Sequence, residues 1–377
     1  MWTGLFLLLV IFALIISRDL WAGLFEILLG RGPRPVPQAA VDWESECPAG
    51  VHLALTPSGV ALLAYPTSGD RPDGSPGVPT ASIALVRGGT YSTRLSRPGS
   101  PVGVAFRPPD LSGTGTAPAE AEWVVVLARS WDEAPGQPGE RAVAVAPGGG
   151  ERDIYALPGA VVTVARGWFD GAGFIVAFYF AGVASPAQGL IVAVGDAGQE
   201  LWSRVVDSLP VHRVAVRSGV PFVAAATPNT LALLDARGNL LWSKTIRGGI
   251  SDIALQSHGG PAVVAGGKLF VYDRRGNLLW KKTGAAMVSV ACAAKRIAVA
   301  GPDGVMVYDE DGLEKWSLAC PSPALDVELD WEAGLVAVVL DSGRLVVARA
   351  PGLPETSGAW SPYRSGEGGA EACEGPG

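Results

Sequence analysis

A tryptophan that recurs at nearly regular intervals constrains the fold of this chain more than any other feature. It ends four similar segments, GDAGQELW, DARGNLLW, DRRGNLLW and DEDGLEKW, and its positions are Trp202, Trp242, Trp280 and Trp316. The intervals are 40, 38 and 36 residues. Such a period is too long for a hairpin and matches one four-stranded blade of a β-propeller. The repeat therefore predicts an all-β ring of similar sheets.

Short apolar runs separated by Gly, Pro and Asp fill the rest of each repeat. In residues 211–246, three such runs precede an Ala-Arg-Gly turn and the strand NLLWSKTI, which is the pattern of four strands joined by tight turns. The predicted innermost strands begin near Val51, Val102, Val161, His212, Ser251, Val288 and Leu325. We therefore predict a seven-bladed β-propeller over residues 41–350, with eight or six blades as alternatives.

The two ends of the predicted ring offer two ways to close it. Residues 43–48, WESECP, mirror residues 316–321, WSLACP, so residues 41–47 are predicted to form the outer strand of the last blade. Joining the first and last segments in this way removes the free edges of an open sheet. The alternative closure uses residues 358–360, GAW, as that strand. Residues 351–377 are otherwise expected to form a partly disordered C-terminal tail.

The N-terminus has the composition of a membrane anchor. Residues 1–17 carry no charged side chain, and at ~1.5 Å per residue they give about 26 Å of helix, against about 30 Å for the bilayer core. Apolar residues continue to Leu29. We predict a transmembrane anchor helix over 1–30, with residues 2–29 in the lipid bilayer, followed by a Pro-rich spacer over 31–40. A cleaved signal peptide is the alternative, and the basic start and cleavage site that it requires are missing.

Charge and cysteine usage exclude several classes of function. A net charge of −7 argues against nucleic acid as a partner, because such proteins present a basic face. With three histidines and no CxxC pair, no zinc site is expected. An even number of cysteines permits two disulfides outside the cytoplasm, whereas free buried thiols are the alternative. The cysteines are Cys47, Cys292, Cys320 and Cys373, and Cys47 and Cys373 would be near each other because the ends of a ring meet.

Polar residues begin several of the predicted innermost strands, around the central channel. Aligning these strands places Gly103 and Val161 at the equivalent positions of two blades, and a polar residue at the other five. The polar residues are His52, Arg213, Asp252, Ser289 and Asp326. One interpretation is a structural salt bridge between Arg213 and Asp252 of neighbouring blades. The other is a ring at the channel mouth that binds a polar ligand. We nominate no catalytic residue, because no Ser-His-Asp set can be chosen without geometry.

Residues 235–242, 273–280 and 309–316 resemble the PQQ-like (quinoprotein-type) propeller repeat, with its pattern Asp-x-x-Gly-x-x-x-Trp. The resemblance covers about residues 190–350. It implies a seven- or eight-bladed propeller that is often exported, often a non-enzymatic assembly factor, and uses the repeat tryptophan to pack blade against blade. The related enzymes also need adjacent cysteines and a Ca²⁺ site. This chain has no adjacent cysteines and only three asparagines, so we expect no cofactor.

These features together predict a membrane-anchored propeller that acts as a non-catalytic protein-interaction or assembly scaffold. Its expected partners are other membrane or cell-surface proteins. The alternative is a propeller enzyme, a quinoprotein-like oxidoreductase or a hydrolase, with its site at the channel mouth. Arg18, Arg31 and Arg34 favour a cytoplasmic propeller, whereas the resemblance favours export. The expected location is the cell membrane, with a single pass and an extracytoplasmic propeller.

Overall fold

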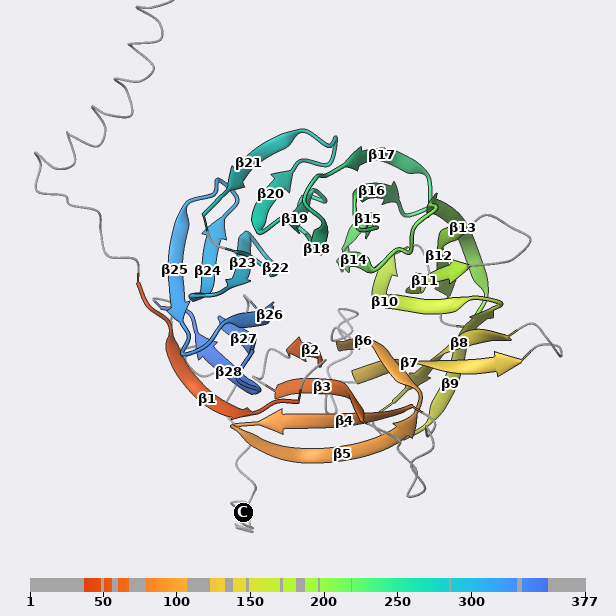
Figure 1. Cartoon of the computed structure of the whole chain (residues 1–377), viewed down its shortest axis with the longest axis horizontal. Coiled ribbons are helices and arrows are strands. Elements are labelled where there is room, and N and C mark those ends of the chain that lie inside the picture. Colours follow the sequence, from red (N-terminus) through yellow and green to blue (C-terminus); the bar gives the residue numbers. More distant parts are fainter. Residues whose placement is uncertain are drawn as a thin grey trace, which may run out of the picture. The chain divides into compact units, whose positions relative to one another are not determined.

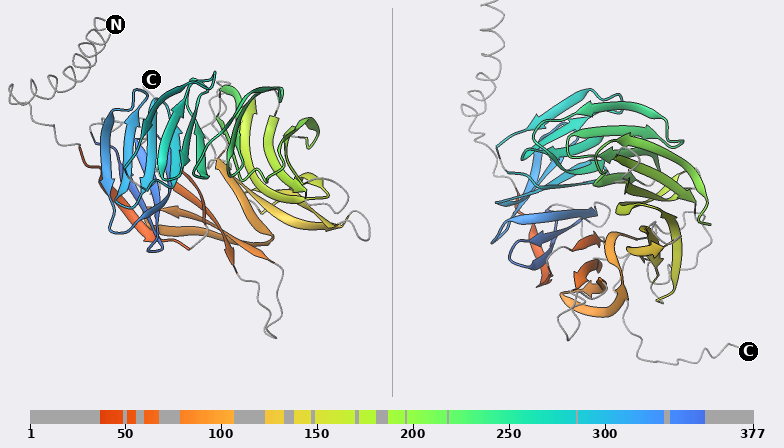
Figure 2. Two further views of the ribbon diagram at one scale, coloured as in Figure 1. Left: turned by 45° about the horizontal axis from the view of Figure 1, so that its top comes forward. Right: turned by 45° about the vertical axis from the view of Figure 1, so that its right-hand side comes forward.

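The computed structural model of the chain forms seven four-stranded antiparallel sheets arranged around a common axis, as Figures 1 and 2 show. The prediction of an all-β, seven-bladed propeller is confirmed. The residues that the structure describes are 37–48, 51–55, 60–67, 79–106, 123–132, 138–146, 149–169, 172–180, 187–195, 197–217, 219–284, 286–330 and 334–351. No helix within these residues is long and apolar enough to cross a membrane. The predicted anchor helix, residues 31–36 of the spacer and residues 352–377 of the tail lie outside them.

The first three blades follow the chain without interruption, from the innermost to the outermost strand. Blade 1 consists of β2 (His52–Leu55), β3 (Val60–Thr67), β4 (Thr80–Arg87) and β5 (Thr90–Pro98). Blade 2 consists of β6 (Ser100–Phe106), β7 (Trp123–Asp132), β8 (Pro138–Val145) and β9 (Glu151–Leu157). Blade 3 consists of β10 (Ala160–Phe169), β11 (Ala172–Phe180), β12 (Gln188–Gly195) and β13 (Glu200–Asp207).

Blades 4 to 6 have shorter strands in the same order, and blade 7 combines the two ends of the chain. Blade 4 consists of β14 (Arg213–Arg217), β15 (Val220–Ala226), β16 (Thr230–Asp235) and β17 (Leu240–Thr245). Blade 5 consists of β18 (Ile250–Leu255), β19 (Pro261–Ala265), β20 (Lys268–Tyr272) and β21 (Leu278–Lys282). Blade 6 consists of β22 (Ser289–Ala293), β23 (Arg296–Gly301), β24 (Gly304–Asp309) and β25 (Glu314–Ala319). Blade 7 consists of β26 (Ala324–Asp330), β27 (Leu335–Leu340), β28 (Arg344–Arg349) and β1 (Ala40–Glu46).

Apolar side chains of the two middle strands of each blade form the core. Every residue of β19 and of β27 is buried, whereas every residue of β17 is at least partly exposed. A sheet covered on both faces by neighbouring sheets needs apolar residues at consecutive positions rather than at alternate ones. This explains why the middle strands read as continuous Val, Ala and Leu runs.

The N-terminal strand closes the ring. Strand β1 pairs with β28 in antiparallel register from Ala40 opposite Arg349 to Glu46 opposite Arg344. Two ion pairs cross this seam: Arg349 contacts Asp42 at 2.9 Å, and Arg344 contacts Glu44. The closure that pairs residues 41–47 with the last blade is therefore the one that forms. The alternative segment, residues 358–360, lies outside the described residues.

A β-bulge occurs at the same position of the outer strand in all seven blades. We call the place that the repeat tryptophan takes in the outer strand the repeat position. In each blade this position pairs with one residue of the third strand, and the next residue of the third strand pairs two places earlier in the outer strand. One residue of the outer strand is therefore left without a partner strand residue. Trp43 thus belongs to the repeat by backbone register. The repeat positions of blades 1 to 7 are Thr93, Tyr155, Trp202, Trp242, Trp280, Trp316 and Trp43.

The repeat tryptophans of blades 3 to 5 join each blade to the next. Their indole Nε1–H groups donate to backbone oxygens in the following outer turn, at 2.8 Å for Trp202 to Ala236, 3.0 Å for Trp242 to Arg274 and 2.7 Å for Trp280 to Glu310. A glycine of the same turn lies against the indole; a Cβ added to Gly238 would be 2.6 Å from the Trp202 ring. Gly238 also has a φ of 77°, which favours glycine. These tryptophans have a structural role.

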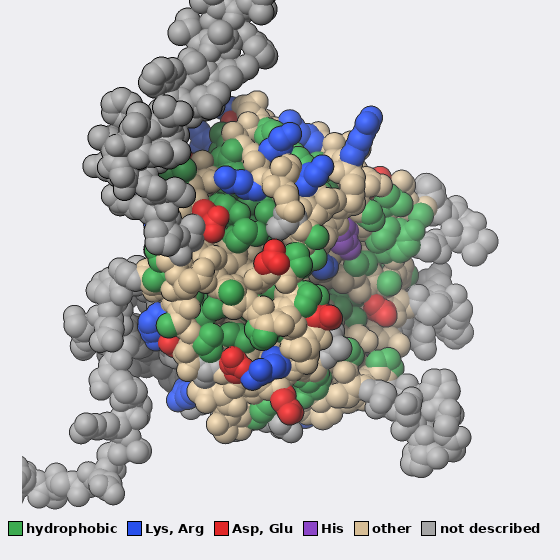
Figure 3. Space-filling view, turned by 60° about the vertical axis from the view of Figure 1, so that its left-hand side comes forward, with side chains coloured by type: hydrophobic (Ala, Val, Ile, Leu, Met, Phe, Trp, Pro, Cys, Tyr) green, Lys and Arg blue, Asp and Glu red, His purple; other side chains and the backbone are tan. Residues whose placement is uncertain are grey.

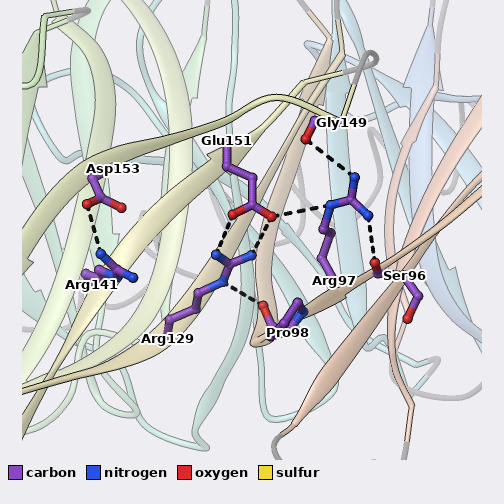
Figure 4. Close-up of polar contacts among 8 residues, drawn as sticks. All are labelled: Ser96, Arg97, Pro98, Arg129, Arg141, Gly149, Glu151 and Asp153. Carbon is purple, nitrogen blue, oxygen red and sulfur yellow. Dashed lines mark hydrogen bonds and ion pairs between the residues drawn. The ribbon is translucent and has the colours of Figure 1, made fainter.

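A network of arginines and carboxylates replaces the tryptophan contact between blades 1 and 2 (Figure 4). Arg129 binds Glu151 through two hydrogen bonds of 2.6 and 2.8 Å, and its Nε donates to the Pro98 oxygen of blade 1 at 2.7 Å. Arg97 of blade 1 contacts the same carboxylate at 3.3 Å. The Arg129 guanidinium lowers the pKa of Glu151 below its ordinary value. Bidentate geometry and shared partners make this network stronger than an isolated surface ion pair.

Candidate functional site

Four of the five polar residues predicted at the channel mouth form one connected network. Arg213 at the start of β14 pairs with Asp252 of β18, with 3.3 Å between Nε and Oδ1. The Ser289 hydroxyl of β22 lies 2.7 Å from Asp252 Oδ2 and 2.7 Å from Asp326 Oδ1 of β26. The network therefore links the innermost strands of blades 4, 5, 6 and 7. The expected salt bridge between Arg213 and Asp252 is present as part of it.

The geometry of this network favours a proton on one of its carboxyl groups. A serine hydroxyl carries a single proton, so Ser289 donates to only one of its two carboxylate neighbours. Asp252 already faces Arg213 and accepts the Val290 N–H at 2.9 Å. Among the described residues, Asp326 accepts only the Val327 N–H in addition to the serine contact. Burial, reinforced by the charge of Asp252, raises the pKa of Asp326 to about 6. Burial raises the pKa of Asp252 as well, but of the two carboxyl groups bridged by Ser289, Asp326 has fewer donors and is thus the one that takes up the proton.

A third carboxyl group, Glu328, belongs to the same region, and it was not among the predicted site residues. Burial raises its pKa well above the ordinary value, and the charges of Asp326 and Asp252 add to this effect. Glu328 follows Asp326 by two positions in β26, so both side chains lie on the same face of the strand. The alternation of acidic and apolar residues in the sequence DVELD could have identified Glu328 as a second acidic side chain on the same face of this strand.

His52 lies close to the network without a hydrogen bond to it among the described contacts. Burial lowers its pKa, the positive charge of Arg213 adds to this, and a hydrogen bond with the Pro101 backbone opposes it. A neutral His52 beside Arg213 is consistent with a structural role. The equivalent position in blade 3 is Thr163 rather than the expected Val161, because Thr163 is the residue directly after the bulge and Val161 precedes it. Blades 2, 5 and 7 have the same bulge in their innermost strands.

The cysteines do not form disulfides among the described residues. Cys47, Cys292 and Cys320 are free thiols, which is the alternative that the sequence left open, and Cys373 lies outside the described residues. Burial raises the pKa of Cys47 to about 11 and that of Cys292 to about 12. A thiol becomes a nucleophile or a metal ligand only after losing its proton. These two cysteines therefore act as small apolar side chains of the core.

The chemistry available at the channel mouth is proton binding. Buried carboxyl groups with raised pKa values occur at functional sites and also in structural ion-pair networks. No group of three or more His, Cys, Asp or Glu side chains within the described ranges is arranged to hold a metal ion. A hollow of about 220 Å³ lies at blade 6, and another of about 570 Å³ lies at blades 4 and 5. Neither is lined by a residue of the network. Asp252, Ser289 and Asp326 thus bind mainly one another.

Asp326→Asn should stabilise the protein at pH 8 and flatten its pH profile. Folded Asp326 holds its proton up to about pH 6, whereas an unfolded aspartate releases it near pH 4. The folded state therefore binds more protons between these values, and the free energy of unfolding falls as pH rises through this window. We expect the variant to be more stable than wild type by about 2 kcal/mol at pH 8 and by much less at pH 4. Urea unfolding at both pH values measures this.

Asp311→Asn is the matched control, because it removes the same charge from an exposed turn of blade 6. It should leave the wild-type pH dependence in place. If both variants keep the wild-type profile, Asp326 is not the residue that takes up the proton.

Three exposed apolar side chains lie at the same end of the propeller as this polar network. Leu209 precedes β14, Val288 precedes β22, and Leu325 is the second residue of β26. All three lie at the end of the propeller where the innermost strands begin, and their exposed fractions are 39%, 37% and 48%. Leu325 is also the bulge residue between Ala324 and Asp326. Exposed apolar side chains on a rigid fold are the kind of surface that a protein partner can cover.

The fold places the protein in the class of seven-bladed β-propellers, and the outer-strand repeats of blades 3 to 5 are PQQ-like. Residues 187–284, which span β12 to β21, match the family described as outer membrane protein assembly factor BamB. The predicted resemblance is confirmed over this range, which is narrower than residues 190–350. No curated protein matches the chain.

Solved propeller structures share the fold at low sequence identity. A chain of the mitotic checkpoint complex superposes with a TM-score of 0.55 and 12% identity, over 85% of this protein and 94% of that chain. A chain from the crystal structure of BBS1N in complex with ARL6DN, soaked with mercury, gives 0.57 and 14%, over 84% and 98%. The lead-soaked crystal of the same complex gives 0.55. At these identities the similarity establishes the fold alone.

Proposed function

We propose that this protein is a membrane-anchored, non-catalytic platform that binds a protein partner on the channel-mouth face of its propeller. The observation that carries the proposal is the composition of that face. Arg213, Asp252 and Ser289 are already engaged with one another, whereas three apolar side chains at the same end of the propeller, Leu209, Val288 and Leu325, are exposed. A catalytic site would need polar groups free to meet a substrate. A binding face needs a rigid scaffold and exposed apolar contacts.

Two further observations support the anchored, assembly-type role. Residues 187–284 are similar to a family whose description is an assembly factor of the outer membrane. The uncharged residues 1–17 have the length and composition of a membrane-spanning segment. We place the propeller outside the cytoplasm, as is usual for exported propellers with such repeats.

A single crosslinking experiment tests partner binding and orientation together. Leu325→Cys in the full chain is treated on intact cells with a membrane-impermeant benzophenone maleimide and then irradiated. Only an extracytoplasmic cysteine is labelled, and only a bound partner is captured. We expect a discrete adduct whose protein component, once purified, binds the wild-type chain and binds Leu325→Asp at least tenfold more weakly.

Lys295→Cys is the matched control, because Lys295 is exposed but lies in the turn between β22 and β23, at the opposite end of the innermost strands. It should be labelled equally and give no adduct. Labelling of neither cysteine would place the propeller in the cytoplasm. Labelling of both without a specific adduct at position 325 would contradict the binding face.

A further inference from the structure

Positive charge is concentrated on two blades of an acidic protein. Residues 235–288 contain eight Lys and Arg residues and three Asp residues, whereas the whole chain has a net charge of −7. Asp252 is in the channel network, and Asp235 and Asp273 each bind backbone N–H groups of their own turns. Asp235 and Asp273 also lie near Arg237 and Arg275, so eight basic and three acidic side chains leave an excess of five positive charges. The basic residues are Arg237, Lys244, Arg247, Lys268, Arg274, Arg275, Lys281 and Lys282.

Exposed leucine pairs lie on the same two blades. The outer-strand bulges of blades 4 and 5 project Leu240 with Leu241 and Leu278 with Leu279. Their exposed fractions are between 45% and 49%. In blades 3 and 6 the corresponding pairs contain a charged residue, Glu200 in one and Glu314 and Lys315 in the other. Leucine pairs at the outer-strand bulge therefore occur on the two blades, 4 and 5, that carry the excess of positive charge.

Inter-blade contacts bring the leucines and the basic residues into one surface. The Trp242 indole donates to the Arg274 oxygen at 3.0 Å, which places the Arg274–Arg275 turn of blade 5 beside the leucine pair of blade 4. Lys244 and Lys282 lie over the Tyr272 and Tyr308 rings, at 5.6 and 5.4 Å from the ring centres. Figure 3 shows Lys and Arg side chains gathered at the top of the molecule, near hydrophobic ones. We call this surface, formed by β17, β21 and the turn 273–276, the basic flank.

A hollow at the edge of the basic flank adds polar groups suited to an anion. It has a volume of about 570 Å³ and lies between turns of blades 4 and 5. His258, Arg274 and Arg275 line it together with one carboxylate, Asp273, and Phe222 contributes an apolar wall. Arginine side chains bind phosphate oxygens through several donors at once.

We propose that the basic flank binds the surface of an anionic phospholipid bilayer. Leucines that enter the interface and lysines and arginines that meet anionic headgroups are the two contributions to peripheral membrane binding. Nucleic acid fits less well, because the leucines gain nothing from phosphates and the indoles of Trp242 and Trp280 are engaged between blades rather than free to stack on bases. The inference is independent of the partner proposed for the channel mouth.

Amide hydrogen exchange on the full chain in lipid vesicles tests this inference. The chain is reconstituted in phosphatidylcholine vesicles with and without 30 mol% phosphatidylserine, and exchange is followed in β17 and β21. We expect the anionic lipid to slow exchange there at least fivefold and to leave β5, the outer strand of blade 1, unchanged. A fivefold effect corresponds to about 1 kcal/mol, the contribution of one lysine near an anionic surface. The N-terminal anchor would be inserted in both kinds of vesicle, so it cannot cause a difference in exchange between them.

Two variants separate the charged and the apolar contributions. Lys281→Glu and the double variant Leu241→Ser with Leu279→Ser should each remove most of the slowing. Lys295→Glu reverses a charge on blade 6 and should retain it. Exchange of all variants in pure phosphatidylcholine should equal that of wild type, which shows that they fold.

Three outcomes would overturn the inference. The first is equal exchange in the two kinds of vesicle. The second is slowing that survives both Lys281→Glu and the leucine substitutions. The third is an equal slowing by polyuridylic acid without vesicles, which would identify a nucleic-acid surface instead. None of these outcomes affects the adduct expected at Leu325, so the two proposals can fail separately.

Discussion

A chain that lacks residues 1–46 should fail to form a stable propeller. Strand β1 contributes six paired positions to β28, and each net backbone hydrogen bond is worth about 1 kcal/mol. Their loss alone approaches the total stability of about 5–15 kcal/mol that is typical of a folded domain. It would also leave β28, in which Leu345, Val347 and Ala348 are fully buried, as an exposed apolar edge. Such an edge promotes aggregation.

Circular dichroism and size-exclusion chromatography measure this effect. The matched control begins at Pro37 and keeps β1, together with the Ala39 N–H bond of 2.9 Å to the Ser317 oxygen. It should elute as a folded species with a cooperative thermal transition. A chain without residues 1–46 that melts at the temperature of this control would show that another segment closes the ring.

Trp280→Ala should destabilise the protein by about 3 kcal/mol, because it removes a large side chain packed between two blades. The Trp280 indole meets the Tyr308 ring at 6.0 Å between centres and covers Gly312 of the next blade. It also donates to the Glu310 oxygen at 2.7 Å. Trp280→Phe keeps most of the ring and loses the hydrogen bond, so we expect a cost of about 1–2 kcal/mol. Urea unfolding measures both values.

Trp316 is the matched control, because it takes the same position in the outer strand of blade 6 as Trp280 does in blade 5, but its indole N–H makes no hydrogen bond to the described part of the next blade. Its indole is 2% exposed, and its Nε1 has no partner among the described residues. In blade 7 the turn that would supply the acceptor is interrupted, since the third and fourth strands come from opposite ends of the chain. Trp316→Phe removes an unsatisfied buried donor, so its cost should be lower than that of Trp280→Phe by about 1 kcal/mol. Equal costs would show that the indole bonds do not hold the blades together.

The repeat made most of the fold predictable from the sequence. Asp, Gly and Trp recur at fixed offsets, and each has its own physical reason. The Asp carboxylate accepts N–H groups of the turn, the Gly adopts a positive φ, and the Trp indole packs against the Gly of the following blade's turn. In Asp235-Ala-Arg-Gly238, for example, the carboxylate accepts the Arg237 and Asn239 N–H groups at 2.9 and 2.8 Å. The mirrored segment after Trp43 also indicated the closing strand.

Blades 1 and 2 were less accessible to prediction, because different chemistry joins them to their neighbours. Thr93 and Tyr155 replace tryptophan at the repeat position. Tyr155 donates to Glu200 of blade 3, and Arg129 with Glu151 connects blade 2 to blade 1. These contacts depend on residues far apart in the sequence, so a search for one motif does not find them.

The sequence predicted where the channel network lies, but it identified only some of the residues that belong to it. The start of each innermost strand identified Arg213, Asp252, Ser289 and Asp326. Bulges in the innermost strands are not visible in the sequence, and in blade 3 the aligned residue is Thr163, after the bulge, rather than Val161, before it. Glu328 was missed because its raised pKa depends on burial near Asp326 and Asp252, which only the closed ring creates.

The most direct test of this account is native-state amide exchange of β1 in the full chain. If β1 is the outer strand of blade 7, its paired amides should exchange as slowly as those of β17 in blade 4, and Glu44→Pro should accelerate exchange in β28 as well. Exchange of residues 40–46 within seconds, at the rate of an unfolded segment, would contradict a ring closed by its N-terminal strand.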